Sequence, residues 1–125
     1  MAKVVLTADR TLMSEYQNNM FFGFSASFPK KFMPSFVYYR MFAPSVSHRG
    51  GVATHAPYAL RKIEASLVAD GFDRSEVVVA HPEYLDRFVG EDTLVLGVSA
   101  MDPLGFGPVT STFTNVYKNP AHIPE

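Results

Sequence analysis

The sequence predicts an α/β domain built on a parallel sheet. Three short apolar runs, at residues 4–6, 76–80 and 93–98, have the composition of strands that are buried on both faces. A predicted helix precedes the second run and a shorter one precedes the third, which gives the order strand, helix, strand, helix, strand. This alternation favours right-handed crossovers and a doubly wound sheet.

The first strand, residues 4–6, runs into Thr7-Ala8-Asp9-Arg10, and we expect a polar loop from there to residue 14. Residues 14–53 show no clean periodicity. Within them, residues 36–42 are rich in β-forming side chains between two prolines, which predicts a strand or an extended segment. Residues 45–53 combine Ser, His, Arg and two glycines, a composition that favours a mobile loop.

The second half of the chain has clearer signals. Leu60, Ile63 and Leu67 recur at helical spacing, with Pro57 suited to the start of the helix and Gly71 to its end. A short helix is expected from His81 to Gly90, before the third strand. Residues 109–117 are interpreted as a further helix, and residues 119–125 as a frayed tail.

Composition indicates one domain, which we assign to residues 1–118. The chain has 125 residues, of which 47% are hydrophobic and 18% charged, enough for one core. Eleven basic and twelve acidic residues give no positive surface, so we expect no nucleic-acid partner. Neither an apolar run of about 20 residues nor a signal-peptide pattern occurs, which predicts a cytoplasmic protein with no membrane partner.

Polar residues after the predicted strands are the candidate ligand contacts, because parallel sheets bind ligands beyond the carboxyl ends of their strands. Asp9 follows the first strand, and Ser99 and Asp102 follow the third. Asp9 has an alternative role as a cap for the next turn. Gly105 and Gly107 permit close backbone approach, but a Gly-x-Gly beside prolines also makes an ordinary turn and is not a dinucleotide-binding fingerprint.

The histidines form no recognised metal-binding motif. His48, His55 and His81 have no ligand spacing typical of zinc, so we assign no metal site. We interpret His81, before Pro82, as a helix-entry residue. The chain has no cysteine, which excludes disulfides, thiolate nucleophiles, and zinc or iron–sulfur sites built from its own thiolates.

Three segments together resemble a known family. They are RKIEASLVADGF at residues 61–72, VVVAHPEYLDRF at 77–88 and LGVSAMDPLGFG at 96–107. The chain resembles, over residues 4–114, the N-terminal cobalamin-binding-type domain of radical S-adenosylmethionine proteins, the archaeal and bacterial iron–sulfur oxidoreductases. The resemblance implies a flavodoxin-like fold of three layers.

Cobalamin-binding domains of this kind carry Asp-x-His-x-x-Gly after the first strand, and the histidine replaces the lower axial base of cobalt. The matching positions here are Asp9, Arg10, Thr11 and Ser14, so the histidine and the glycine are both replaced. Radical S-adenosylmethionine members commonly lack that histidine. A family serine after the third strand, which contacts the nucleotide tail of the cofactor, matches Ser99.

The resemblance therefore implies a set of cofactor-binding residues and an incomplete domain. A family glycine pair after a later strand has no counterpart that we can match, so we expect part of the fold to be missing. The implied contacts lie after the first and the third strand: Asp9, Arg10, Thr11, Ser14, Ser99, Met101, Asp102 and Gly105.

The function implied by the resemblance is that of an accessory domain. It would position cobalamin or a related ligand for a radical S-adenosylmethionine domain in cis, either as a natural domain or as a fragment of a longer protein. S-adenosylmethionine and the four-iron cluster would belong to that domain, because the Cys-x3-Cys-x2-Cys loop that holds the cluster needs cysteines.

A non-catalytic domain that no longer binds cofactor is the alternative. The aromatic residues between positions 21 and 42 form a dense group outside the periodic core, which suggests either a homodimer interface or ordinary cover for the sheet. An independent enzyme is the third option, but no nucleophile, base and orienting group can be assembled from this sequence.

Overall fold

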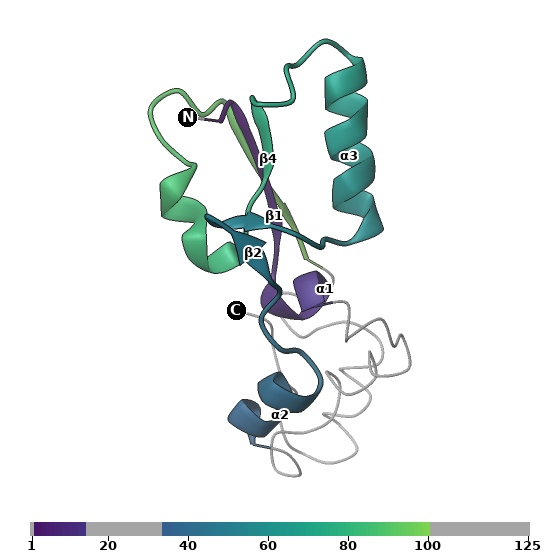
Figure 1. Cartoon of the computed structure of the whole chain (residues 1–125), viewed down its shortest axis with the longest axis vertical. Coiled ribbons are helices and arrows are strands. Elements are labelled where there is room, and N and C mark those ends of the chain that lie inside the picture. The colour runs from purple at the N-terminus through teal and green to yellow at the C-terminus, as the bar shows by residue number, and fades with distance from the viewer. Residues whose placement is uncertain (1, 15–33, 101–125) are drawn as a thin grey trace, which may run out of the picture.

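A three-stranded parallel sheet forms the centre of the computed structural model, which describes residues 2–14 and 34–100 (Figure 1). Strand β1 (Val4–Ala8) lies between β4 (Val77–Val79) and β5 (Val95–Ser99), in the order β4-β1-β5. Both pairings are parallel, with Val4 opposite Val77 on one side and opposite Val95 on the other. The predicted α/β class with a parallel sheet is confirmed.

The central strand separates two hydrophobic clusters. All five residues of β1 are buried, and successive side chains point to opposite faces of the sheet. Val4, Leu6 and Ala8 pack in one cluster with Leu60 of helix α3 (Tyr58–Ala69). On the other face, Val5 packs in a cluster with residues around the short helix η3 (Pro82–Arg87). In Figure 1, α3 and η3 lie on opposite sides of the sheet.

Helix α3 begins and ends where the flanking Pro57 and Gly71 predict. Pro57 precedes its first residue, and the chain turns after its last one at Gly71, whose φ of 112° lies in the left-handed region. The amide of Phe72 donates to the carbonyl of Leu67 at 3.1 Å and closes the helix end. The expected helix before the second strand is therefore confirmed.

The predicted strand at residues 36–42 is wrong, because this segment forms helix α2 (Ser35–Met41). The amide of Tyr38 donates to the carbonyl of Pro34 at 3.1 Å, and that of Phe42 to the carbonyl of Tyr38 at 2.9 Å. The Tyr38 ring is fully buried and packs edge-on against Tyr39, with 5.1 Å between the ring centroids. Burial of Tyr38 in the helix outweighs the β propensity of the individual residues.

The predicted mobile loop at residues 45–53 contains an ordered hairpin instead. Strands β2 (His48–Arg49) and β3 (Val52–Ala53) pair antiparallel around Gly50 and Gly51, whose φ angles are 59° and 93°. Two adjacent residues with positive φ make a tight hairpin turn that suits glycine. The hairpin joins the main sheet through a bridge between Val52 and Ala80.

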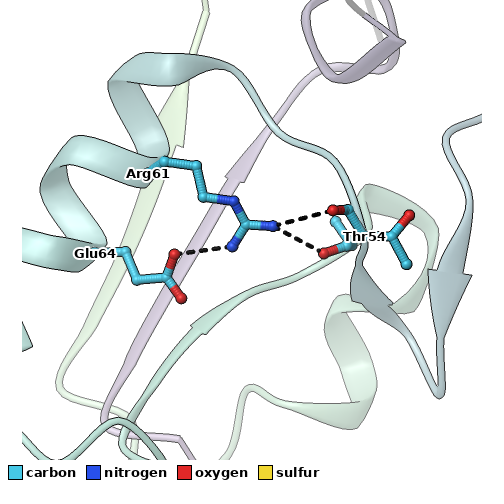
Figure 2. Close-up of polar contacts among 4 residues, drawn as sticks. Thr54, Arg61 and Glu64 are labelled. Carbon is cyan, nitrogen blue, oxygen red and sulfur yellow. Dashed lines mark hydrogen bonds and ion pairs between the residues drawn. The ribbon is translucent and has the colours of Figure 1, made fainter.

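Arg61 fastens this hairpin to helix α3 (Figure 2). One guanidinium nitrogen donates to the Glu64 carboxylate at 2.8 Å, and another donates to the carbonyls of Ala53 at 3.1 Å and Thr54 at 3.5 Å. The same side chain therefore satisfies backbone acceptors at the exit of β3 and pairs with its own helix. This contact holds the hairpin near the carboxyl end of β4.

Strand β5 is exposed, although the sequence predicts a buried third strand. The exposed fractions of Val95, Leu96 and Val98 are 52%, 46% and 62%. Within the described residues, β5 pairs only with β1 and so lies at the edge of the sheet. The predicted helix at residues 109–117, the tail at 119–125 and the aromatic residues at 21–33 lie outside the described residues.

No helix within residues 2–14 and 34–100 has the length and apolar character needed to cross a bilayer.

Candidate functional site

The carboxyl ends of all three parallel strands meet at one edge of the sheet. Ala8 of β1 is in register with Ser99 of β5. Asp9, the residue after Ala8, therefore lies next to the end of β5. The connection from β1 leads to β4 on one side, and the connection from β4 crosses to β5 on the other. A ligand crevice in such a sheet lies where the strand order reverses, which is between β1 and β5.

Asp9 is the most informative residue at this edge. Its Oδ1 atom accepts hydrogen bonds from the amides of Thr11 at 2.9 Å and Leu12 at 3.1 Å, and also from the Thr11 hydroxyl. These bonds cap helix α1 (Arg10–Ser14), so the polar loop expected there is a short helix and the capping role of Asp9 is confirmed.

The second carboxylate oxygen of Asp9 has no such role. The residue is only 8% exposed, and its Oδ2 atom has no hydrogen-bond partner within the described part of the chain. A buried polar atom without a partner costs about 1–3 kcal/mol, more when the group is charged. A ligand that brings an N–H or O–H donor to Oδ2 would remove this cost.

The other predicted residues of α1 are used differently. Thr11 is buried and its hydroxyl is held by Asp9, while the Ser14 hydroxyl donates to the carbonyl of Thr11 at 2.7 Å. Arg10 extends away from β5: its Nε atom donates to the carbonyl of Ala43 at 3.3 Å, and its guanidinium lies 5.0 Å from the centroid of the Tyr39 ring. Helix α1 thus supports Asp9 and directs Arg10 elsewhere.

On the β5 side, the structure places only part of the predicted set. Ser99 is half-buried at the end of β5, beside β1. Met101, Asp102 and Gly105 lie outside the described residues. Of the predicted contacts, the structure therefore brings Asp9 and Ser99 to neighbouring strand ends.

His81, at the end of β4, is buried more deeply than its predicted role requires. Its Nδ1 atom accepts a hydrogen bond from the amide of Glu83 at 3.2 Å, which confirms it as the cap of η3. Its Nε2 atom lies 2.9 Å from the Ser45 hydroxyl. Burial lowers the pKa of His81 below its usual value. The ring is therefore neutral at pH 7, with its proton on Nε2.

The neighbouring histidines form no metal centre. His48 packs edge-on against His81, with 5.2 Å between the ring centroids, and its Nδ1 atom accepts from the amide of Gly51 at 3.2 Å. His55 contacts Thr54 instead. Across residues 2–14 and 34–100, no three His, Asp or Glu side chains are grouped closely enough to hold a metal ion.

Two hollows accompany these residues. A cavity of about 220 Å³ at the strand ends is lined by Arg10, Tyr39, Pro82 and Glu83. The larger hollow, about 470 Å³, is lined only by side chains of α3 and the residue that follows it. Because that groove lies on one helix, away from the strand ends, it brings no groups together from different elements. The smaller cavity, in contrast, brings together a guanidinium, a carboxylate and an aromatic ring from three elements.

No family model matches the chain, and no curated protein or solved structure matches it. The sheet and the side chains at its carboxyl edge therefore carry the information about function.

Proposed function

We propose that this chain is a flavodoxin-like accessory domain that binds cobalamin or a related cofactor between the ends of β1 and β5. It would hold the cofactor for a radical S-adenosylmethionine catalytic domain outside this chain. The observation that carries the proposal is the buried Oδ2 atom of Asp9, which lacks a partner within the described residues, at the point where the strand order reverses.

The residues present fit such a ligand. The corrin ring is surrounded by amide side chains, whose N–H groups would donate to Oδ2 of Asp9. The hydroxyl of Ser99, on the neighbouring strand, offers a second polar contact on the same face of β5 as the exposed side chain of Val95. An apolar crevice with a few polar groups is the usual form of a cofactor site.

Helix α1 offers no histidine as a ligand for cobalt. Thr11 occupies the position of the family's axial histidine, and its buried hydroxyl is hydrogen-bonded to Asp9. No nitrogen ligand for cobalt comes from this loop. When bound, cobalamin would supply the cobalt centre, while the chain would orient the corrin and exclude water from one side of it.

The test is a titration of the purified protein with hydroxocobalamin, followed by absorbance and calorimetry. Asp9→Asn keeps an Oδ1 acceptor for the helix cap but replaces Oδ2 with an amino group that cannot accept, so we expect roughly tenfold weaker binding, as for the loss of one hydrogen bond to a charged group. Asp86→Asn, an exposed substitution on η3 with the same charge change, should leave affinity unchanged. Absence of binding by the wild-type protein contradicts the proposal.

A second candidate function is self-association or docking without a cofactor. It is favoured by the exposed apolar side chains of β5 and by Phe36, which is 75% exposed on α2. Contiguous exposed apolar surface commonly marks an interaction site. A cofactor titration without binding, together with self-association in sedimentation, would select this candidate.

A further inference from the structure

A polar cavity lies at the carboxyl ends of β1 and β4, on the other side of β1 from β5. It is lined by Arg10 of α1, Tyr39 of α2, and Pro82 and Glu83 at the start of η3, so three elements contribute to it. Its volume of about 220 Å³ is that of roughly seven water molecules at about 30 Å³ each. This is room for a molecule of only a few heavy atoms.

The two charged residues of this cavity do not neutralise each other. The salt bridges among the described residues are Lys3–Glu76 and Arg61–Glu64, and neither involves Arg10 or Glu83. The guanidinium of Arg10 is oriented by its Nε bond to Ala43 and by the Tyr39 ring, and its two terminal amino groups make no hydrogen bond in the described part of the chain. An oriented cation and a carboxylate that forms no salt bridge among the described residues therefore line one small cavity.

Both charges also act on the neighbouring ring of His81. Burial is the main reason that the pKa of His81 is lowered, while the carboxylate of Glu83 raises this pKa and the guanidinium of Arg10 lowers it. His81 directly precedes Pro82 in the cavity lining, and that lining brings Arg10 and Glu83 to one place. The neutral imidazole adds no third charge to the cavity.

We propose that this cavity binds a small zwitterion of the amino-acid type. The carboxylate of the ligand would pair with the terminal amino groups of Arg10, whose planar fork matches a carboxylate. The ammonium group would pair with Glu83, and the Tyr39 ring would cover the apolar part between them. The ligand replaces water at two charged groups that form no salt bridge within the described residues, so both of its ends are recognised.

The experiment is a titration of isotope-labelled protein, followed by amide chemical shifts, with glycine, L-alanine and L-serine as probes. Acetate and methylammonium supply one charge each and serve as comparison probes. We expect at least one amino acid to shift the amides around Arg10, Tyr39 and Glu83. Either single-charge probe should bind roughly tenfold more weakly, because it satisfies only one of the two charges.

Glu83→Gln should weaken amino-acid binding roughly tenfold, whereas Glu91→Gln, the same charge change at an exposed position of the loop before β5, should not. Circular dichroism checks that both variants are folded. Both should bind hydroxocobalamin like the wild type, which separates this proposal from the corrin proposal. The zwitterion site would be overturned if none of the three amino acids shifted these amides. It would also be overturned if acetate bound as tightly as the amino acids, or if Glu83→Gln left the affinity unchanged.

Discussion

His81 connects the electrostatics of the sheet edge to its stability. Because burial lowers its pKa in the folded chain, the unfolded chain takes up a proton more readily. The free energy of unfolding is therefore highest above the unfolded pKa of about 6.5 and decreases as the pH falls from there through the folded pKa. Protonation of Nδ1 would also remove the acceptor for the amide of Glu83.

We expect the denaturation midpoint in urea to decrease between pH 7.5 and 5.5, and His81→Asn to make this decrease smaller. His55→Gln, a substitution at an exposed histidine, is the matched control and should keep the pH dependence of the wild type. A pH dependence that persists unchanged in His81→Asn would show that another group causes it.

Residue positions were predicted more accurately than their contacts. The sequence placed Asp9 at a strand end and His81 at a helix entry, because both follow apolar runs with clear boundaries. It could not show that Ser45 would meet His81, since the two residues are 36 positions apart. Nor could it show that one oxygen of Asp9 caps α1 while the other has no partner within the described residues.

At the scale of elements, the hairpin turn shows how one glycine differs from its neighbour. A Cβ atom on Gly51 would lie 2.9 Å from Cε2 of Phe88 and 3.0 Å from Cβ of Tyr84, whereas a Cβ on Gly50 would meet nothing within 4 Å. Both residues have positive φ, which costs a residue with a side chain about 1–2 kcal/mol. Only Gly51 adds steric overlap, worth about 1–3 kcal/mol.

We therefore expect Gly51→Ala to lower the free energy of unfolding by about 3 kcal/mol and Gly50→Ala by about 1 kcal/mol. Urea denaturation of both variants measures the difference, and hydrogen exchange at His81, whose amide donates to the carbonyl of Gly51 at 2.8 Å, reports whether the hairpin has detached. If both variants lose the same free energy of unfolding, Tyr84 and Phe88 must move away from residue 51 without an energetic cost.

The sequence predicts those elements whose own residues carry a clear apolar pattern. Helix α3 has regular apolar spacing and strand β4 is a continuous apolar run, and both have the expected character and position. The sequence predicts a strand where α2 forms, because the aromatic residues there have β propensity, and the burial of Tyr38 depends on contacts that spacing does not encode. The two glycines of the hairpin were a usable signal, but the flanking strands are only two residues each.

For the whole molecule, the sequence predicted the sheet type but not the environment of each strand. Alternation of strands and helices is sufficient to predict parallel pairing. Whether a strand is central or at an edge depends on sheet order, and an apolar run has the same composition in both places. Hence β1 and β5 look alike in sequence, although all of β1 is buried and β5 is largely exposed.

The exposure of β5 predicts self-association of the protein. Val95, Leu96 and Val98 carry no charge, and within the described residues β5 is an apolar edge strand without Lys or Pro, which is a template for pairing with another chain. Val98→Lys places a charge on this edge and should reduce association in sedimentation velocity measured over a range of concentrations. Because Val98 is 62% exposed, its replacement should change the free energy of unfolding by less than about 0.5 kcal/mol.

Ala69→Lys, which adds the same charge at an exposed position of α3, is the control and should associate like the wild type. If wild-type protein stays monomeric at all concentrations, the predicted self-association is wrong. If both variants associate equally, the association does not involve β5. Loss of association in Val98→Lys alone would place the contact on β5, because the added charge is the same in both variants and only its location differs.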